Sequence, residues 1–150
     1  MVEPLSNLVA IVPAIVPSNG AAGVTAINGA VLDLAAYNAY AFAVLITWGP
    51  IVAGGAQSFK VQTDTALAFG SAQDIAGSSQ TVADDDDDKT FVTDIINPPE
   101  PYARVAVSRA TQNSTVASAT YLVYRLRKKP ASQSAVEGLE VHRDKAVGTA

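Results

Sequence analysis

The stretch YNAYAFAVLITW, residues 37–48, decides the fold class of this chain. It is an almost unbroken run of apolar and aromatic residues from Tyr37 to Trp48, and Gly49-Pro50 follows it directly. A short apolar run that ends in turn residues is typical of a β-strand covered on both faces. We therefore predict a central, buried strand here.

A second kind of strand pattern follows in QSFKVQTD, residues 57–64. Phe59 and Val61 alternate with the polar residues Lys60 and Gln62. Successive side chains of a strand point to opposite faces, so this alternation indicates a strand with one face in the core and one in water.

Three further strands are expected toward the end of the chain, at residues 90–97, 102–110 and 115–127. The last two are predicted to form a hairpin around TQNS, residues 111–114. Within the final strand, one face is expected to carry Val116, Leu122, Tyr124 and Leu126, and the other Arg125 and Arg127. Nearer the start, Asn28-Gly29 between short apolar runs predicts a turn.

Together these patterns predict one all-β domain over residues 23–130, an antiparallel β-sandwich or jelly roll. The chain has 150 residues, enough for one domain with a substantial core. It contains no cysteine, so disulfides and thiolate metal sites are excluded. No run reaches the roughly 18 apolar residues of a membrane-spanning helix, and we expect no membrane partner.

The two ends are expected to differ from this domain. In residues 1–22, three prolines favour an extended arm, yet the segment is too apolar to prefer water. Such an arm should lie on its own domain, on a sister subunit or on a larger surface. We predict that its large aliphatic residues contact another subunit or such a larger surface: Leu8, Ile11, Val12, Ile15 and Val16. Residues 131–150 are expected to form a polar C-terminal tail.

Charge is unevenly distributed along the chain, whose net charge is −4. Residues 1–103 hold eleven acids and two bases, whereas residues 104–150 hold eight bases and three acids. Such a layout can orient subunits electrostatically, and it can equally reflect strand faces of different charge.

Five consecutive aspartates, Asp84 to Asp88, precede Lys89. We expect a solvated loop between strands, because adjacent carboxylates repel one another and require water. The alternative is a weak cation site on Asp84, Asp86 and Asp88, since alternate residues of an extended segment share one side.

Residues suited to catalysis are sparse, and we predict neither enzymatic activity nor a cofactor. The single histidine, His142, lies in the polar tail, and no Gly-x-Ser-x-Gly elbow or glycine-rich phosphate loop is present. One histidine without cysteine excludes a zinc site of the usual kind. The basic cluster RLRKK, residues 125–129, fits phosphate contacts or, as we prefer, a strand end or subunit contact, so no nucleic-acid partner is predicted.

Four phrases together resemble a known family: LDLAAYNAYAFAVLITWG (32–49), FKVQTDTALAFGSAQDIAG (59–77), PPEPYARVAVSRAT (98–111) and ATYLVYRLRKKP (119–130). Their order is similar to that of small virion proteins of tailed bacteriophages. The matching positions are Tyr37, residues 39–47, Lys60-Val61-Gln62, residues 102–105 and residues 121–130. The resemblance covers about two thirds of the chain, and the apolar arm and the aspartate block depart from it.

The resemblance implies a capsid decoration, or cement, protein. Such proteins are β-rich, often trimeric, and bind the outer capsid surface of the virion where major capsid subunits meet. The expected partners are therefore the major capsid protein and further copies of this chain in a homotrimer. Two alternatives stay open: another phage structural part, such as a neck, tail or fibre-base protein, and a carbohydrate-binding module that uses Trp48 and the tyrosines to stack on sugars.

Overall fold

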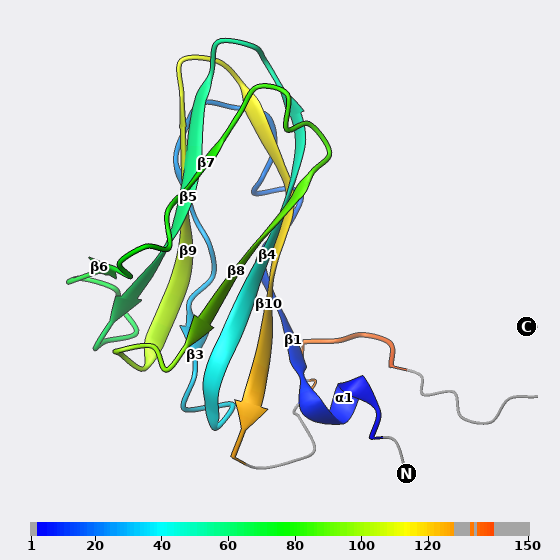
Figure 1. Cartoon of the computed structure of the whole chain (residues 1–150), viewed down its shortest axis with the longest axis vertical. Helices are drawn as coiled ribbons and strands as arrows, with labels where there is room; N and C mark the ends of the chain where they lie inside the picture. The colour runs from blue at the N-terminus through cyan, green and yellow to red at the C-terminus, as the bar shows by residue number, and fades with distance from the viewer. Residues whose placement is uncertain (1–2, 128–132, 134, 140–150) are drawn as a thin grey trace, which may run out of the picture.

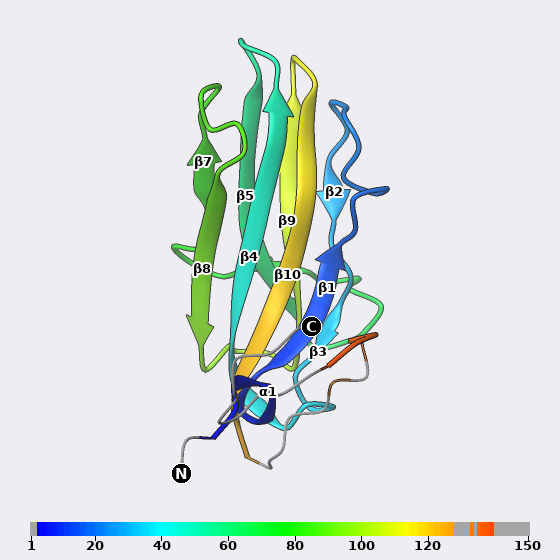
Figure 2. The same ribbon diagram turned by 90° about the vertical axis from the view of Figure 1, so that its right-hand side faces the viewer.

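The chain is described by a computed structural model that covers residues 3–127, 133 and 135–139. Two antiparallel sheets pack face to face, which confirms the predicted all-β sandwich (Figures 1 and 2). A single short helix, α1 (Leu5–Leu8), precedes the strands in this part of the chain.

Sheet A has four strands in the order β1 (Ala10–Ile15), β10 (Ser114–Leu126), β4 (Ala39–Ile51) and β8 (Thr90–Ile96). The two central strands, β4 and β10, have 13 residues each and run almost the full height of the molecule (Figure 2). The expected strands at residues 37–48, 90–97 and 115–127 are all in this sheet.

Sheet B is built around β9 (Tyr102–Ala110) and β5 (Ala56–Asp64), which pair along nine residues. Shorter strands complete its two sides. One side of β9 pairs with β2 (Ile27–Asn28) and β3 (Leu32–Asp33), and one side of β5 pairs with β6 (Gln73–Asp74) and β7 (Gln80–Val82).

The core lies between the sheets and is filled by the inward side chains of the long strands. Phe42 and Tyr121 meet edge to face with ring centroids 5.9 Å apart, and Phe59 and Phe91 do so at 5.8 Å. Trp48 is fully buried. The alternation predicted for β5 is confirmed, since Phe59 and Val61 are buried while Lys60 and Gln62 lie on the outer face.

The predicted hairpin around residues 111–114 is wrong, because the connection crosses from sheet B to sheet A. β9 pairs with β5, β2 and β3, whereas β10 pairs with β4 and β1. The connections from β4 to β5, from β7 to β8 and from β8 to β9 also cross between the sheets. The sandwich is therefore held together by pairings between strands that are distant in sequence.

Asn28-Gly29 does not form the predicted turn between paired strands. Asn28 is the last residue of β2, and β2 and β3 both pair with β9, so the segment that begins at Gly29 interrupts one edge of sheet B. Gly29 donates its N–H to the carbonyl of Val105 at 2.8 Å, and a Cβ at this position would lie 2.7 Å from a Val105 methyl. Glycine is required here for a close approach of the backbone.

Two buried polar side chains join the N-terminal segment to both sheets. The Tyr121 hydroxyl accepts the Val105 N–H at 2.9 Å and donates to the Ala30 carbonyl at 2.8 Å. Arg109 donates to the carbonyls of Thr25, Ala21 and Ser114 at 2.7–2.8 Å. Desolvation raises the pKa of Tyr121 and lowers that of Arg109, which is the direction that burial imposes on each charged form.

Candidate functional site

The predicted contact segment lies on its own domain, the first of the three alternatives. Residues 10–15 form the edge strand β1, and Ala10, Ile11, Val12 and Pro13 pair in register with residues 120–123 of β10. The boundary expected at residue 22 is therefore corrected, because β1 is part of sheet A.

The five predicted contact residues have different surroundings. Ile15 is only 2% exposed and belongs to the core, so its assignment as a subunit contact is corrected. Val12 packs against the core, and Leu8 is half-buried in α1. Ile11 and Val16 are each 41% exposed. The contact prediction stays open for these two exposed side chains.

Ile11 belongs to a continuous apolar surface on the outside of sheet A. The strand registers place Ile11, Leu122, Ala43 and Asp94 in one row across the sheet, and Pro13, Thr120, Leu45 and Val92 in the next. A third row contains Tyr124, Ala41 and Ile96. Residues that face one another across strands share a face of the sheet, so these rows form one surface, which we name the sheet A face.

Exposure distinguishes the sheet A face from the core beneath it. Val92 and Ile96 are 56% and 52% exposed, whereas the alternate residues Val44, Ile46 and Trp48 are fully buried. Residues 37–48 were expected to be covered on both faces, but the outward side chains Ala43 and Leu45 are only half-buried. The sequence therefore supplies an apolar second face that is partly exposed in the rows of Ile11 and Pro13, whereas Ala41 in the third row is fully buried.

One ionisable pair lies on this face. The Tyr124 hydroxyl donates to the carboxylate of Asp94 in the neighbouring row. Desolvation, followed by this hydrogen bond and the nearby negative charge, raises the pKa of Tyr124 to about 12. This hydrogen bond gives the Asp94 carboxylate, on the edge strand β8, a partner on the same face.

The sequence pattern of β10 indicated part of this face, but the prediction placed one of its residues on the wrong side of the strand. Val116, Leu122 and Tyr124 were expected together on one face, but Val116 is buried while Leu122 and Tyr124 point outward. The register shifts between Val116 and Ser118. An extra residue at such a shift inverts which side chains face the core.

The aspartate block is held by hydrogen bonds to another loop. Asp84 accepts the Gly54 N–H at 2.7 Å, and Asp87 accepts the Ile51 N–H at 2.7 Å, so both fasten the connection between β4 and β5. Asp86 accepts the Ala83 N–H at 2.8 Å and pairs with Lys89 at 2.9 Å. The Ala83 N–H, and then Lys89, lower the pKa of Asp86.

These bonds change the interpretation of the block. It is a loop, as expected, but three of its five carboxylates cap backbone or lysine groups and do not merely face water. Within the described residues, no group of three or more His, Asp or Glu side chains is arranged to hold a metal ion. We therefore assign the block a structural role at the β4–β5 connection.

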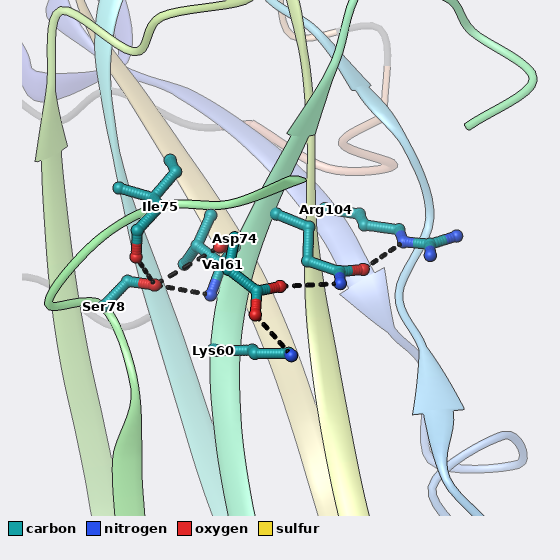
Figure 3. A network of polar contacts seen from close by, with 7 residues as sticks. Lys60, Val61, Asp74, Ile75, Ser78 and Arg104 are labelled. Carbon is teal, nitrogen blue, oxygen red and sulfur yellow. Dashed lines mark hydrogen bonds and ion pairs between the residues drawn. The ribbon is translucent and has the colours of Figure 1, made fainter. Parts of the chain in front are cut away.

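The outer face of sheet B has a different character. Lys60 pairs with Asp74 at 2.6 Å, and Gln62 links Asp74 to Arg104 through bonds of 2.9 and 3.0 Å (Figure 3). Arg104 also lies over the ring of Phe69, 4.4 Å from its centroid. Hydrogen bonding to Lys60, then to Gln62, lowers the pKa of Asp74. We call this set of side chains the sheet B network.

A groove of about 460 Å³ crosses the sheet B network, with Lys60 and Arg104 among its lining residues. Both cations already have partners inside the network, so an incoming anion would have to compete with Asp74 and Gln62. The groove is therefore less suited to anion binding than its two basic residues suggest.

Other residues considered from sequence have simpler placements. Trp48 is a core residue, so it is not available to stack on a sugar. Arg127 lies over the ring of Tyr40 at 4.1 Å, beside the end of β10. Lys128 and Lys129 of the basic cluster, His142 and most of the C-terminal tail lie outside the described residues.

Comparisons with known proteins do not extend these observations. No protein-family model matches the chain, and a search of curated proteins finds no match. Among the described residues, no helix has the length and apolar character needed to span a membrane.

Proposed function

We propose that this chain is a structural virion protein that decorates the outer surface of a tailed-phage capsid. In this proposal it associates as a homotrimer, binds the major capsid protein and reinforces contacts between capsid subunits, without catalysis or a cofactor. The observation that carries the proposal is the sheet A face, which is apolar, spans four strands and is exposed on the single chain.

The energetics of this face support a role in association. Exposed apolar patches on a soluble protein typically mark interaction sites. Ile11, Val92 and Ile96 are each between two fifths and three fifths exposed. Covering such side chains contributes roughly 25 cal/mol per Å² of apolar surface removed from water. The gain is repeated at every lattice position, because a decoration protein binds many equivalent sites.

The rigidity of the face also suits a binding role. The strands are ordered by the core beneath them, so most of the ordering entropy has been lost before a partner arrives. An arm that folded on the capsid would have to lose that entropy on binding. The incorporation of β1 into sheet A thus favours a preformed contact surface.

The test is substitution of Ile11 with aspartate, which places a charge on the sheet A face but leaves the core unchanged. We expect circular dichroism to show that the variant stays folded. We also expect purified virions assembled with the variant to contain fewer copies of it than wild-type virions contain of the wild-type protein. Lys60→Asp on the sheet B network is the matched control, and should decorate like the wild type. Normal decoration by Ile11→Asp would contradict the assignment of the sheet A face.

Copy number separates this proposal from its nearest alternative. A decoration protein should be present in numbers that match the lattice sites of the capsid, whereas a neck, tail or fibre-base protein should be present in far fewer copies. Quantitative mass spectrometry of virions, with the major capsid protein as the internal reference, measures this ratio. Light scattering of the purified protein measures whether the solution unit has the mass of three chains.

A further inference from the structure

The two edges of sheet A are not equivalent, and the difference identifies a second interaction surface. The β1 edge is occupied. The Ala14 carbonyl accepts the Ala30 N–H at 2.7 Å, Pro13 has no N–H, and Gln133 bonds the Val9 carbonyl and the Ile11 N–H through its side-chain amide. These features are among the ways in which proteins prevent unwanted pairing at a sheet edge.

In the described part of the chain, the β8 edge has less of this protection, and the Gln80 side-chain amide of β7 bonds it at the Val92 carbonyl and the Thr93 hydroxyl. β8 is the terminal strand of its sheet, and Figure 2 shows it at the side of the molecule opposite β1. Its sequence, TFVTDII, contains no proline, glycine or lysine, and its pairing with β4 runs over all seven residues without a register shift. The residues are mostly β-branched or aromatic, which favour strands.

The hydrogen-bond pattern shows which backbone groups face away from β4. At the two ends, Trp48 donates to the Lys89 carbonyl at 3.0 Å and Asn97 donates to the Tyr40 carbonyl at 2.8 Å. Because antiparallel pairing alternates along a strand, the even-numbered residues of β8 direct their N–H and C=O groups outward. In agreement, the Val92 carbonyl accepts a bond from the Gln80 side chain on β7 at 3.1 Å.

We propose that the β8 edge pairs antiparallel with the β8 edge of a second copy, about a two-fold axis at Thr93. In this register all seven residues of β8 are paired, with Phe91 opposite Ile95 and Thr90 opposite Ile96 of the other copy. Asp94 lies opposite Val92 of the other copy, so the two carboxylates do not face each other. The four outward residues of each strand then form about eight inter-chain hydrogen bonds.

The pairing would also make the two sheet A faces continuous. Val92 and Ile96 carry the face as far as the β8 edge, so each copy extends the apolar surface of the other. The Gln80 amide remains compatible with the pairing, because a carbonyl oxygen has two lone pairs and can accept a second N–H. The two-fold contact does not depend on the proposed virion role. It would join two monomers into a dimer, or two trimers into a hexamer, according to which unit exists in solution.

Size predicts that this contact is weak in dilute solution. A seven-residue strand is about 23 Å long, and sheets in a sandwich are about 10 Å apart, so the contact buries on the order of 500 Å² in total. Stable interfaces bury about 1,200 Å² or more. The pair should therefore form at high local concentration, as on a surface where neighbouring copies are held close together.

Single-cysteine variants test the pairing, because the chain has no cysteine of its own. In the proposed register Thr93 faces its own symmetry mate in a non-hydrogen-bonded pair, where Cα atoms are about 4.5 Å apart, within disulfide range. Under mild oxidation at high protein concentration, Thr93→Cys should form covalent dimers. Val52→Cys, at an exposed position on the β4–β5 connection, is the control for random collisions, and should react at least about tenfold more slowly.

The register is tested by two further variants. Val92→Cys and Asp94→Cys should each cross-link poorly alone and readily when mixed, because each lies opposite the other. Adding Val92→Lys to Thr93→Cys should abolish the accelerated cross-linking while the circular dichroism spectrum stays unchanged. Equal rates for Thr93→Cys and Val52→Cys, or faster cross-linking of Val92→Cys alone, would overturn the proposal.

Discussion

The two outer faces of the sandwich differ in the chemistry of the side chains that they expose to solvent. Both belong to antiparallel sheets whose inner faces form one core, and both have alternating strands. On sheet B the outer side chains bond to one another, through Lys60, Asp74, Gln62 and Arg104. On sheet A many of them are apolar and partly exposed, with a Tyr124–Asp94 hydrogen bond and a Thr47–Thr90 hydrogen bond of 2.8 Å.

This difference shows that the inward side chains stabilise the fold, whereas the outward side chains determine how each sheet interacts with its surroundings. Inward side chains hold the fold, so the outward side chains are free to differ between sheets. A polar network satisfies its own groups and remains stable in water. An apolar face lowers its free energy only when something covers it. The two faces should therefore respond differently to substitution.

The largest loss of stability is expected at the end of β1, where its side chains pack into the core. Ile15→Ala should lower the free energy of unfolding by about 2–5 kcal/mol, because Ile15 is 2% exposed and its loss leaves a cavity. Urea denaturation measures the change. Ile11→Ala, four residues earlier on the same strand, is the control and should cost less than half as much. Similar losses for the two variants would show that β1 does not have distinct inner and outer sides.

The next effect concerns the link between the two sheets. Tyr121→Phe removes the hydroxyl that bonds both the Val105 N–H and the Ala30 carbonyl, leaving two buried groups without this partner. We expect a loss of about 1–3 kcal/mol in the free energy of unfolding. Tyr124→Phe, on the outer face, is the matched control and should have a smaller effect. A neutral Tyr121→Phe would mean that the hydroxyl does not stabilise the closed sandwich.

A pH effect should be specific to the end of sheet B. Asp64 accepts N–H groups from Ala66 and Ser71 at 2.9 and 2.8 Å, and these bonds, the first above all, lower its pKa below the ordinary value of 3.8. A lowered folded-state pKa stabilises the fold above the unfolded-state value, and the contribution is lost as the pH falls through the folded-state value.

Melting temperatures measured from neutral pH down to acid should reveal this contribution. The wild type should lose stability below about pH 4, and Asp64→Asn should show a shallower decline. Asp85→Asn, an exposed residue of the aspartate block, should follow the wild-type curve. Parallel curves for the wild type and Asp64→Asn would exclude Asp64 as a source of acid sensitivity.

The smallest effect is expected on the sheet B network itself. Lys60 and Asp74 form a close ion pair, but their side chains are 41% and 51% exposed. Water and salt screen such pairs, so Lys60→Met should change the free energy of unfolding by no more than about 0.5–1 kcal/mol. Thermal unfolding in low and high salt is the measurement. A loss as large as that of Tyr121→Phe would show that the network, and not the core alone, determines stability.

Much of the fold could be predicted from local sequence. The apolar run at residues 37–48, the alternation at 57–64 and the stretches at 90–97 and 102–110 all contain strands where expected. Alternation and turn residues are local properties, and local patterns determine where strands begin and end.

What failed depends on contacts between distant residues. Sequence alone does not assign a strand to one sheet or the other, so the crossing from β9 to β10 was mistaken for a hairpin. The register shift near Val116 inverted the face of β10. The aspartate block bonds to Ile51 and Gly54, about thirty residues away, and no local pattern shows this. The sheet A face was partly visible, because residues 37–48 had more apolar positions than one buried face requires.

The pairing of β1 with β10 has a consequence for how the protein is made. Residues 10–15 leave the ribosome more than a hundred positions before their partners, residues 119–123. During synthesis β1 therefore stays unpaired until β10 has emerged, and only then can sheet A be completed. The barrier to closing so long a loop is entropic and slows folding. An apolar segment that stays unpaired for so long is a natural ligand for chaperones, which would then have to release it to a strand that has only just been synthesised.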